Sequence, residues 1–465
     1  MRKIVCTLVV LLIATVAGVA QTQKAVKTLF PGGKSYLYRL TLVDKKGTPY
    51  KVTKPQEFLS QKAIERRKRQ GLAVDETDLP LSPKYLKEIR KTGVEIIGCS
   101  KWNNTVLVHG KDSTMMEGLT SLPCVTEVKK VWVSPDSTTL QTRETILPNL
   151  VTEEIKGKSH HGVADYQITL LNGKQLHEAG FRGEGMTMAV IDGGFMNADR
   201  IEVLQNVRIL GTHDFSFPRA ENIFQEPDHG TQVLSCIATN LPETFVGTAP
   251  GADFWLLRTE DTLIESLAEE DFWAMAVEFA DSVGVDVINS SLGYAYFDDP
   301  TMNHLYREQD GRTALNSRTA SKIASKGMVL VNSAGNFGSG TWKKINFPAD
   351  ATDILAVGAL RPDKVNAVFS SIGPTADGRV KPDVMSLGAP AQVINGQGVI
   401  KRSNGTSFAA PILAGMVTCL WQALPNKTAQ EIVEIVRRSG NNYTTPDNIF
   451  GYGIPDFWKA YETNK

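Results

Sequence analysis

From residue 170 onward, apolar residues gather in short continuous runs that are separated by longer stretches with helical periodicity. A strand covered on both faces appears as such a run, because neither of its faces meets water. Apolar runs that alternate with helices predict a parallel sheet flanked by helices. The runs are MTMAVID (186–192), DFWLLRT (253–259), DVINSS (286–291), MVLVNSAG (328–335) and ILAVGAL (354–360).

Two polar residues stand where these apolar runs end. Asp192 closes the first run, and Asn336 directly follows the fourth. Parallel α/β sheets bind their ligands at the carboxyl ends of the strands, so we expect both side chains at one edge of the sheet. The sequence predicts the functional site at this edge.

Residues 35 to 135 have a different pattern, in which short alternating stretches mix with helical ones. From residue 84 the expected order is a helix, strands at 94–99 and 104–109, a helix at 113–121 and a strand at 125–132, which is typical of a split βαβ unit. We therefore expect a small α+β domain over residues 21–135 and a main α/β domain over residues 166–465. Residues 136–165 are polar and aperiodic, which indicates a linker.

Residues 1–20 have the layout of a secretory signal. Two basic residues precede an apolar run, and the small residues Gly18 and Ala20 stand just before Gln21. The run is short for a membrane-spanning helix, which argues against a retained anchor. The sequence therefore predicts cleavage after Ala20, export to the periplasm or the medium, and no attachment to a membrane afterwards.

The amino-acid composition says more about the possible binding partners of the protein than about its fold. The chain has 465 residues, 42% of them hydrophobic, which is enough for a large core and a smaller domain. Lys plus Arg equals Asp plus Glu at 50 each, so the basic excess of a nucleic-acid-binding protein is absent. Outside the signal no CxxC pair for zinc occurs, and buried thiols are expected at Cys99, Cys124, Cys236 and Cys419. The sequence does not decide whether Cys99 and Cys124 form a disulfide.

The stretch SNGTSFAAPILAG, residues 403–415, places Ser407 before an apolar helix. Pro411 is tolerable only near the start of that helix, because the first amides of a helix have no helical partners. The Ser407 N–H would therefore be free to bind a substrate oxygen, and Gly405 would leave room for the substrate. The alternative is that Ser407 or Thr406 only caps the helix.

A serine hydroxyl needs a base before it can act as a nucleophile. All histidines precede Ser407 and no GxSxG motif occurs, which excludes the order of an α/β-hydrolase. His229 opens a helix in DHGTQVLSCIA, where Gly230 keeps the surroundings open, and Asp192 is the carboxylate expected to orient it. Cys236, on the same helix, is expected to pack in the core.

Several segments, in this order, resemble motifs of the subtilisin-like serine proteases. IDGGF resembles the aspartate motif of that family, HGTQV its histidine motif, and NGTSFAAPILAG its serine motif. SAGNFG resembles its oxyanion-asparagine segment, INSSLGY its substrate-binding strand, and FSSIGPTADGRVKPDVMSLG the loop and strand before the serine. The resemblance extends from about residue 165 to residue 460.

The resemblance implies a serine endopeptidase in which Asp192 orients His229, His229 deprotonates Ser407, and Ser407 forms an acyl-enzyme. It implies that Asn336 and the Ser407 N–H bind the oxyanion. The substrate peptide would lie along Ser290, Leu292, Gly293, Ala334 and Gly335. Gln232 stands where the family usually has a histidine, which leaves the contacts around His229 open.

By pattern and position, residues 21–135 resemble the ferredoxin-like propeptide that folds and blocks such proteases. The resemblance implies a zymogen that matures in the linker, with its own propeptide and protein or peptide substrates as partners. The basic stretch ERRKR (65–69) could be a processing site, but we expect it to be the solvated face of a helix.

Two other functions compete with this one. A catalytically silent scaffold protein with the same fold is disfavoured, because the aspartate, histidine, serine and oxyanion asparagine are all present. A serine amidase built on Ser290 and Ser291 lacks a suitable lysine pattern. No cofactor is expected to be required and no metal site is predicted. The sequence does not decide whether acidic loops such as FDDP (297–300) bind calcium.

Overall fold

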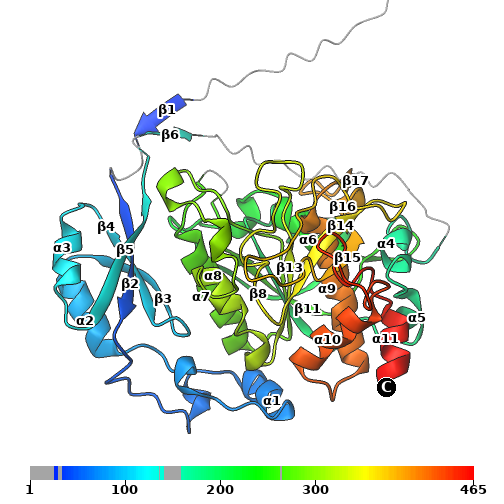
Figure 1. The fold of residues 1–465 in the computed structure, drawn as a ribbon, viewed down its shortest axis with the longest axis horizontal. Helices are drawn as coiled ribbons and strands as arrows, with labels where there is room; N and C mark the ends of the chain where they lie inside the picture. Colours follow the sequence, from blue (N-terminus) through cyan, green and yellow to red (C-terminus); the bar gives the residue numbers. More distant parts are fainter. Residues whose placement is uncertain (1–25, 30–33, 136, 141–158, 262–263) are drawn as a thin grey trace, which may run out of the picture.

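The computed structural model describes residues 26–29, 34–135, 137–140, 159–261 and 264–465, and Figure 1 shows their arrangement. The predicted signal (1–20) and most of the predicted linker lie outside the described residues. Two layered bodies are visible, a small α+β unit and a larger α/β unit that carries the C-terminal end of the chain.

The larger unit is built on a seven-stranded parallel sheet in the order β15-β14-β13-β12-β7-β11-β8. Its strands are β7 (Thr187–Asp192), β8 (Arg208–Asp214), β11 (Asp253–Arg258), β12 (Val287–Ser290), β13 (Val329–Ser333), β14 (Leu355–Leu360) and β15 (Val384–Leu387). The parallel sheet and the five strands expected from apolar runs are confirmed. The apolar pattern missed both edge strands. β8 alternates between exposed and partly buried residues and forms no continuous run, and β15 has only four residues.

Both faces of the sheet are buried, which explains the continuous apolar runs. On β7, Met188 and Val190 face the core shared with α6 (His229–Ala238) and α9 (Thr406–Ala423). Their neighbours Ala189 and Ile191 face the core shared with α7 (Glu269–Val283) and α8 (Leu315–Ala320). Successive side chains of a strand point to opposite faces, so a strand covered on both faces needs apolar residues at every position.

The topology sets the position of the site. Strand β7 lies between β11 and β12: the chain first places β8 and β11 on one side of β7, and then places β12 and the later strands on its other side. Such a reversal of strand order is where α/β sheets open a crevice at their carboxyl ends. Asp192 is the last residue of β7, and Asn336 follows the end of β13.

The smaller unit has a four-stranded antiparallel sheet in the order β3-β4-β2-β5. Its elements are β2 (Tyr36–Leu42), α2 (Pro83–Lys91), β3 (Glu95–Ser100), β4 (Thr105–Gly110), α3 (Met115–Thr120) and β5 (Val125–Val133). These bounds differ by one or two residues from the expected ones, and the order is that of the predicted split βαβ unit. One face of this sheet packs on α2 and α3, and residues of the other face, such as Leu37 and Leu107, share a core with Trp273 of α7.

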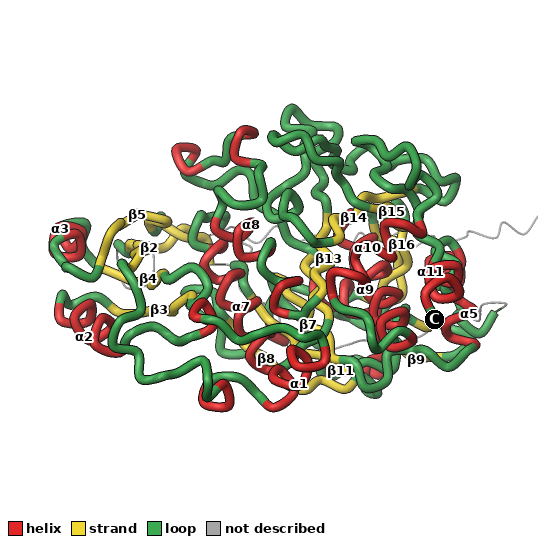
Figure 2. The backbone as a smooth tube through the Cα atoms, turned by 60° about the horizontal axis from the view of Figure 1, so that its bottom comes forward, coloured by secondary structure: helices red, strands yellow, loops and turns green. Residues whose placement is uncertain are grey.

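Shorter elements complete the two units. They are α1 (Gln61–Arg69), α4 (Asp165–Thr169), α5 (Lys174–Glu178), α10 (Ala429–Ser439), α11 (Phe457–Asn464) and the antiparallel pairs β1 (Val26–Leu29) with β6 (Ser137–Leu140), β9 (Asn240–Leu241) with β10 (Phe245–Val246), and β16 (Ala391–Ile394) with β17 (Ile400–Ser403). Figure 2 shows α1 apart from the four-stranded sheet and near α7.

The four cysteines in the described part of the chain are free, and the Cys99–Cys124 bridge is not formed. Cys124, Cys236 and Cys419 are buried, as expected, whereas Cys99 is only partly buried. Among the described residues, α9 is the one helix long and apolar enough to cross a membrane, but 89% of it is buried inside the fold. Its apolar surface is therefore accounted for by the protein core.

Candidate active site

Asp192 and His229 form a directly hydrogen-bonded pair. The Nδ1 atom of His229 lies 2.8 Å from Oδ1 and 3.0 Å from Oδ2 of Asp192. The Asp192 side chain is 1% exposed and the His229 side chain is 39% exposed, so the imidazole reaches from a buried carboxylate to the surface. A carboxylate at Nδ1 fixes the tautomer and leaves Nε2 as the reactive nitrogen.

Gly230 allows the first turn of α6 to approach the end of β7. Its N–H donates to the Gly194 carbonyl at 2.9 Å. A Cβ at this position would lie 2.4 Å from the Gly194 oxygen and 2.9 Å from the Asp192 Cβ. A side chain there would push the histidine away from its carboxylate, so the glycine has a packing reason as well as the predicted openness.

The electrostatic surroundings favour a protonated His229. Burial acts to lower the pKa of the imidazole, but the charge of Asp192 and its hydrogen bond outweigh burial and raise the pKa above its ordinary value of 6.5. More distant carboxylates, Glu260 and Asp228, act in the same direction. The site therefore stabilises an imidazolium, as a general base requires once it has taken up a proton.

Ser407 lies in the first turn of α9 and is 8% exposed. Its hydroxyl donates to the Ser291 carbonyl at 3.3 Å, and the Ser291 hydroxyl donates to the Ser407 carbonyl at 2.8 Å. Pro411 is the sixth residue of α9 and has no N–H to give to the Ser407 carbonyl, which an uninterrupted helix would bond in that way. Ser291 therefore supplies the hydrogen bond that Pro411 cannot make.

The side-chain oxygen of Asn336 is anchored by the same helix. Its Oδ1 accepts from the backbone N–H and from the hydroxyl of Thr406, at 3.0 Å each. The Thr406 hydroxyl in turn accepts from the Gly335 N–H at 3.2 Å. Because Thr406 binds Oδ1, the Nδ2 group is the part of the Asn336 side chain that can donate hydrogen bonds to a ligand.

Asp192, His229, Ser407 and Asn336 line one cavity of about 260 Å³. Of the five residues expected to bind substrate, this cavity includes Leu292, Gly293 and Gly335. Ser290 and Ala334 do not line it. The buried Ser290 hydroxyl accepts from Trp273 Nε1 at 3.0 Å on the opposite face of the sheet, and Ala334 is fully buried in the core.

The sequence reasoning missed other residues of the same cavity. Asn346, Glu260 and Glu265 line it, together with Ser291, which lies within the expected substrate-binding segment 290–293. The alternation of strand side chains could have distinguished Ser291 from Ser290, but Asn346 and the two glutamates lie in loops whose paths carry no periodic signal.

Two of these carboxyl groups have shifted pKa values. Burial raises the pKa of Glu260 to about 7. Desolvation, and after it the charges of Glu260 and Asp298, raise the pKa of Glu265 to about 8. Carboxyl groups with raised pKa values beside a histidine-aspartate pair indicate a functional region more than a solvated turn.

Gln232, which stands where the resembled family usually has a histidine, links two elements beside the site. Its Nε2 donates to Asp228 at 3.0 Å, and its Oε1 accepts from Ser403 at 3.2 Å, so it joins the start of α6 to β17.

His161 and His177 contact each other at 3.0 Å inside the core, and burial lowers the pKa of each to about 4. These two histidines are part of the packing.

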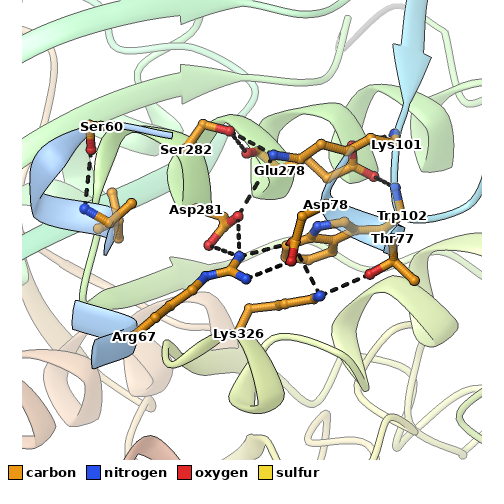
Figure 3. A network of polar contacts seen from close by, with 12 residues as sticks. Ser60, Arg67, Thr77, Asp78, Lys101, Trp102, Glu278, Asp281, Ser282 and Lys326 are labelled. Atoms are coloured by element: carbon orange, nitrogen blue, oxygen red, sulfur yellow. Dashed lines mark hydrogen bonds and ion pairs between the residues drawn. The ribbon is translucent and has the colours of Figure 1, made fainter. Parts of the chain in front are cut away.

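The N-terminal unit is attached to the main unit by buried ion pairs (Figure 3). Arg67 of α1 donates to Asp78 at 2.7 Å and to Asp281 of α7 at 2.8 Å, and Arg66 also binds Asp281. Arg66 and Arg67 are 2% and 1% exposed. The expectation that ERRKR is a solvated helix face is therefore wrong, because two of its arginines are buried against acidic residues that are distant in sequence.

Two more contacts extend this interface. Lys326 binds Asp75 at 2.9 Å and Asp78 at 3.1 Å. Arg39 of β2 makes a double hydrogen bond to Asp271 at the start of α7, with distances of 2.6 and 2.8 Å. The interface therefore extends along α7, from Asp271 in its first turn to Asp281 near its end.

In the described part of the chain, no group of three or more His, Cys, Asp or Glu side chains is placed to hold a metal ion.

Comparisons with known proteins are consistent with this geometry. The chain is 30% identical over 291 residues to Subtilisin NAT of Bacillus subtilis subsp. natto, covering 62% of this chain and 68% of the relative. It is 30% identical over 292 residues to the subtilisin of Bacillus pumilus, covering 62% and 95%. It is 27% identical over 293 residues to the thermostable alkaline protease of Halalkalibacterium halodurans, covering 62% and 70%.

Two family models also match. The subtilase family model matches residues 183–453, and the model of the Peptidase S8 propeptide domain of Bacteroidota matches residues 37–145. The second match covers the four-stranded sheet and extends past it into the predicted linker.

Proposed function

Because the chain belongs to the subtilase family, and is therefore a serine endopeptidase with an N-terminal propeptide domain, we propose that it is an exported zymogen that cleaves peptide bonds through an acyl-enzyme on Ser407. The observation that carries the proposal is the hydrogen-bonded Asp192–His229 pair in one cavity with Ser407 and Asn336.

Attack begins when the Ser407 hydroxyl leaves the Ser291 carbonyl and turns to His229. Catalytic hydrogen bonds are often long or misdirected without substrate and tighten in the complex. Nε2 of His229 takes the proton while Oγ bonds to the peptide carbonyl carbon. The imidazolium then gives that proton to the leaving amine as the C–N bond breaks. Water attacks the ester while His229 takes its proton, and His229 returns this proton to Oγ of Ser407 as the carboxylic acid leaves.

The developing oxyanion is bound by the Asn336 amide group and the Ser407 backbone N–H. The support for this role is the anchoring of Asn336 Oδ1 by Thr406, which orients the amide before substrate arrives. The start of α9 adds the positive end of its dipole. Loss of one such donor costs about 100- to 1000-fold in turnover, a range that was measured in a subtilisin.

The N-terminal unit is a partner of residues 166–465 until it is removed. The buried ion pairs to α7 support tight docking, and the polar region 136–165 is where we place the maturation cut. The signal-like layout of residues 1–20 supports export, to the periplasm or the medium. We propose that the reaction requires no cofactor.

The proposal is tested by Ser407→Ala. The variant should fold, fail to hydrolyse an unfolded protein and fail to react with a fluorophosphonate. Ser325→Ala, at an exposed serine, serves as the matched control and should keep both activities. Retained labelling of Ser407→Ala would disprove the assignment of the nucleophile.

Maturation gives a second test. The wild-type protein should lose its first 135 to 165 residues in isolation, whereas Ser407→Ala should keep its full length. Equal processing of both proteins would show that the cut is not made by this active site.

A further inference from the structure

A second cavity of about 310 Å³ adjoins the first, and nothing in the proposed chemistry uses it. Glu265, Gly293, Asn336 and Asn346 line both cavities, and Ala295, Tyr296 and Phe337 complete the second. Since Asn336 is the proposed oxyanion donor, the second cavity begins at the carbonyl under attack. Its occupant is therefore the side chain of the residue that provides this carbonyl, and this inference rests on the proposed function.

Three carboxyl groups line the combined cavity, and in the described part of the chain only that of Asp192 forms an ion pair, with His229. Asp192, Glu260 and Glu265 line it, and among the described residues its lining contains no Lys or Arg. The nearby Arg258 is committed elsewhere, to Asp214 at 2.8 Å and Glu226 at 3.1 Å. Glu265 is exposed and forms no ion pair with another described residue, and a cation beside it would favour its charged form. A ligand can therefore supply the cation that this side of the cavity lacks.

Asn346 provides an independent sign of a ligand. It is 6% exposed, lines both cavities, and its Nδ2 donates to the Gly293 carbonyl at 3.2 Å. Its Oδ1 has no hydrogen-bond partner among the described residues. A buried acceptor without a partner is costly, and a ligand with an N–H group would satisfy it.

Aromatic rings form the remaining wall. Tyr296 lies edge-on to Phe337 and to Trp342, with ring centroids 5.7 Å apart in both pairs, and Tyr296 is 41% exposed. An aromatic face beside a carboxylate attracts a cation, and a guanidinium can also stack on such a face.

The walls are held in place by backbone contacts. The Glu265 N–H donates to the Asp298 carboxylate at 3.1 Å, and the Asp298 N–H donates to the Glu265 carbonyl at 2.9 Å. Tyr294 and Phe347 exchange two backbone hydrogen bonds of 2.8 and 3.0 Å, which fixes Asn346 beside Gly293. The cavity is therefore built before a ligand arrives.

We propose that this cavity binds a cationic side chain, arginine or lysine, of the residue whose carbonyl Ser407 attacks. The cation pairs with Glu265, donates to Asn346 Oδ1 and lies against Tyr296 and Phe337. A metal ion does not fit as the occupant, because no group of three or more candidate ligands among the described residues is placed to hold one. Glu265 and Asn346 thus determine specificity toward basic peptides.

Matched peptides test the proposal with the active, matured enzyme. They differ only at the residue before the scissile bond, which is arginine, lysine, citrulline, norleucine or phenylalanine. Citrulline keeps the shape of arginine without its charge. We expect kcat/KM for arginine to exceed that for citrulline by about 10- to 100-fold, from one charge-assisted pair in a partly exposed site. Glu265→Gln should reduce this ratio to about 3 or less, whereas Asn346→Asp should increase it. Glu462→Gln, at an exposed carboxylate, is the matched control and should leave the ratio unchanged.

The outcomes separate this inference from the proposed function. Equal hydrolysis of the arginine and citrulline peptides, or a preference for phenylalanine, would overturn the inference and leave the protease assignment standing. An arginine preference that Glu265→Gln does not change would also overturn it. Failure to hydrolyse any peptide or to react with a fluorophosphonate would contradict the proposed function itself.

Discussion

Replacement of Arg67 by methionine tests how the propeptide domain is attached. Arg67 and Arg69 lie on the same short helix, but Arg67 is 1% exposed and makes hydrogen bonds to two buried carboxylates. The Arg69 side chain is 45% exposed and lies 3.7 Å from Asp286. Arg67→Met and Arg69→Met are therefore the same chemical change in a buried and an exposed environment.

The structure sets the expected sizes. Removal of one partner from a buried ion pair costs about 3–5 kcal/mol. Arg66 and Lys326 still neutralise Asp281 and Asp78 in the variant, so the lower end, about 3 kcal/mol, is expected. This energy corresponds to about a 150-fold change in an equilibrium constant. The exposed Arg69 pair contributes at most about 1 kcal/mol, or about 5-fold.

Hydrogen exchange of the α1 amides measures this difference. A nine-residue helix is not stable alone in water, so its protection reports docking onto the main unit. In full-length protein carrying Ser407→Ala, Arg67→Met should lower α1 protection by about 100-fold or more and Arg69→Met by less than about 5-fold. The amides of β7 should not change and serve as the internal control. Equal losses in both variants would refute the argument that burial makes the difference.

Three further changes probe the active site. Thr406→Val removes the hydroxyl that orients Asn336. Because two hydrogen bonds are lost, kcat should fall by about 5- to 150-fold with little change in KM. Thr406→Ser keeps the hydroxyl, and equal kcat values in both variants would contradict the orienting role. Gly230→Ala places a Cβ 2.4 Å from the Gly194 oxygen and should lower kcat/KM at least tenfold, so wild-type kinetics would show that the contact relaxes freely. The raised pKa of His229 favours the protonated form, which cannot act as a base. We therefore expect kcat/KM to fall as the pH falls through a value above 6.5. A pH profile whose acid limb lies below 6 would contradict a raised pKa of His229.

Much of the fold was predictable from the sequence. The apolar runs located five of the seven strands of the main sheet and missed the two edge strands. β8 is only partly buried, and β15 is buried but has only four residues. The elements of the smaller domain were also readable, because alternation and helical periodicity both appear there. The identity of Asp192, His229 and Ser407 as a set was a prediction from their order and motifs, and the structure places them around one cavity.

The site beyond these residues was not predictable. Ser290 and Ser291 are adjacent in sequence, yet one bonds Trp273 on the far face and the other bonds Ser407. ERRKR reads as a charged helix face, and only its position over Asp281 shows why two of its arginines are buried. Local patterns say which residues prefer water, but they do not say which distant charges will meet them.

Burial and periodicity are local properties of the chain, so the amino-acid pattern was enough to indicate five strands of the main sheet, the elements of the smaller domain and the polar groups at the strand ends. The tertiary structure decided the rest. It brought Asn346 and Glu265 from separate loops to the wall beside Asn336, and it turned Thr406 toward Asn336. These contacts depend on loop paths and on the close approach of backbone at glycines, which are set by the packing of the whole domain.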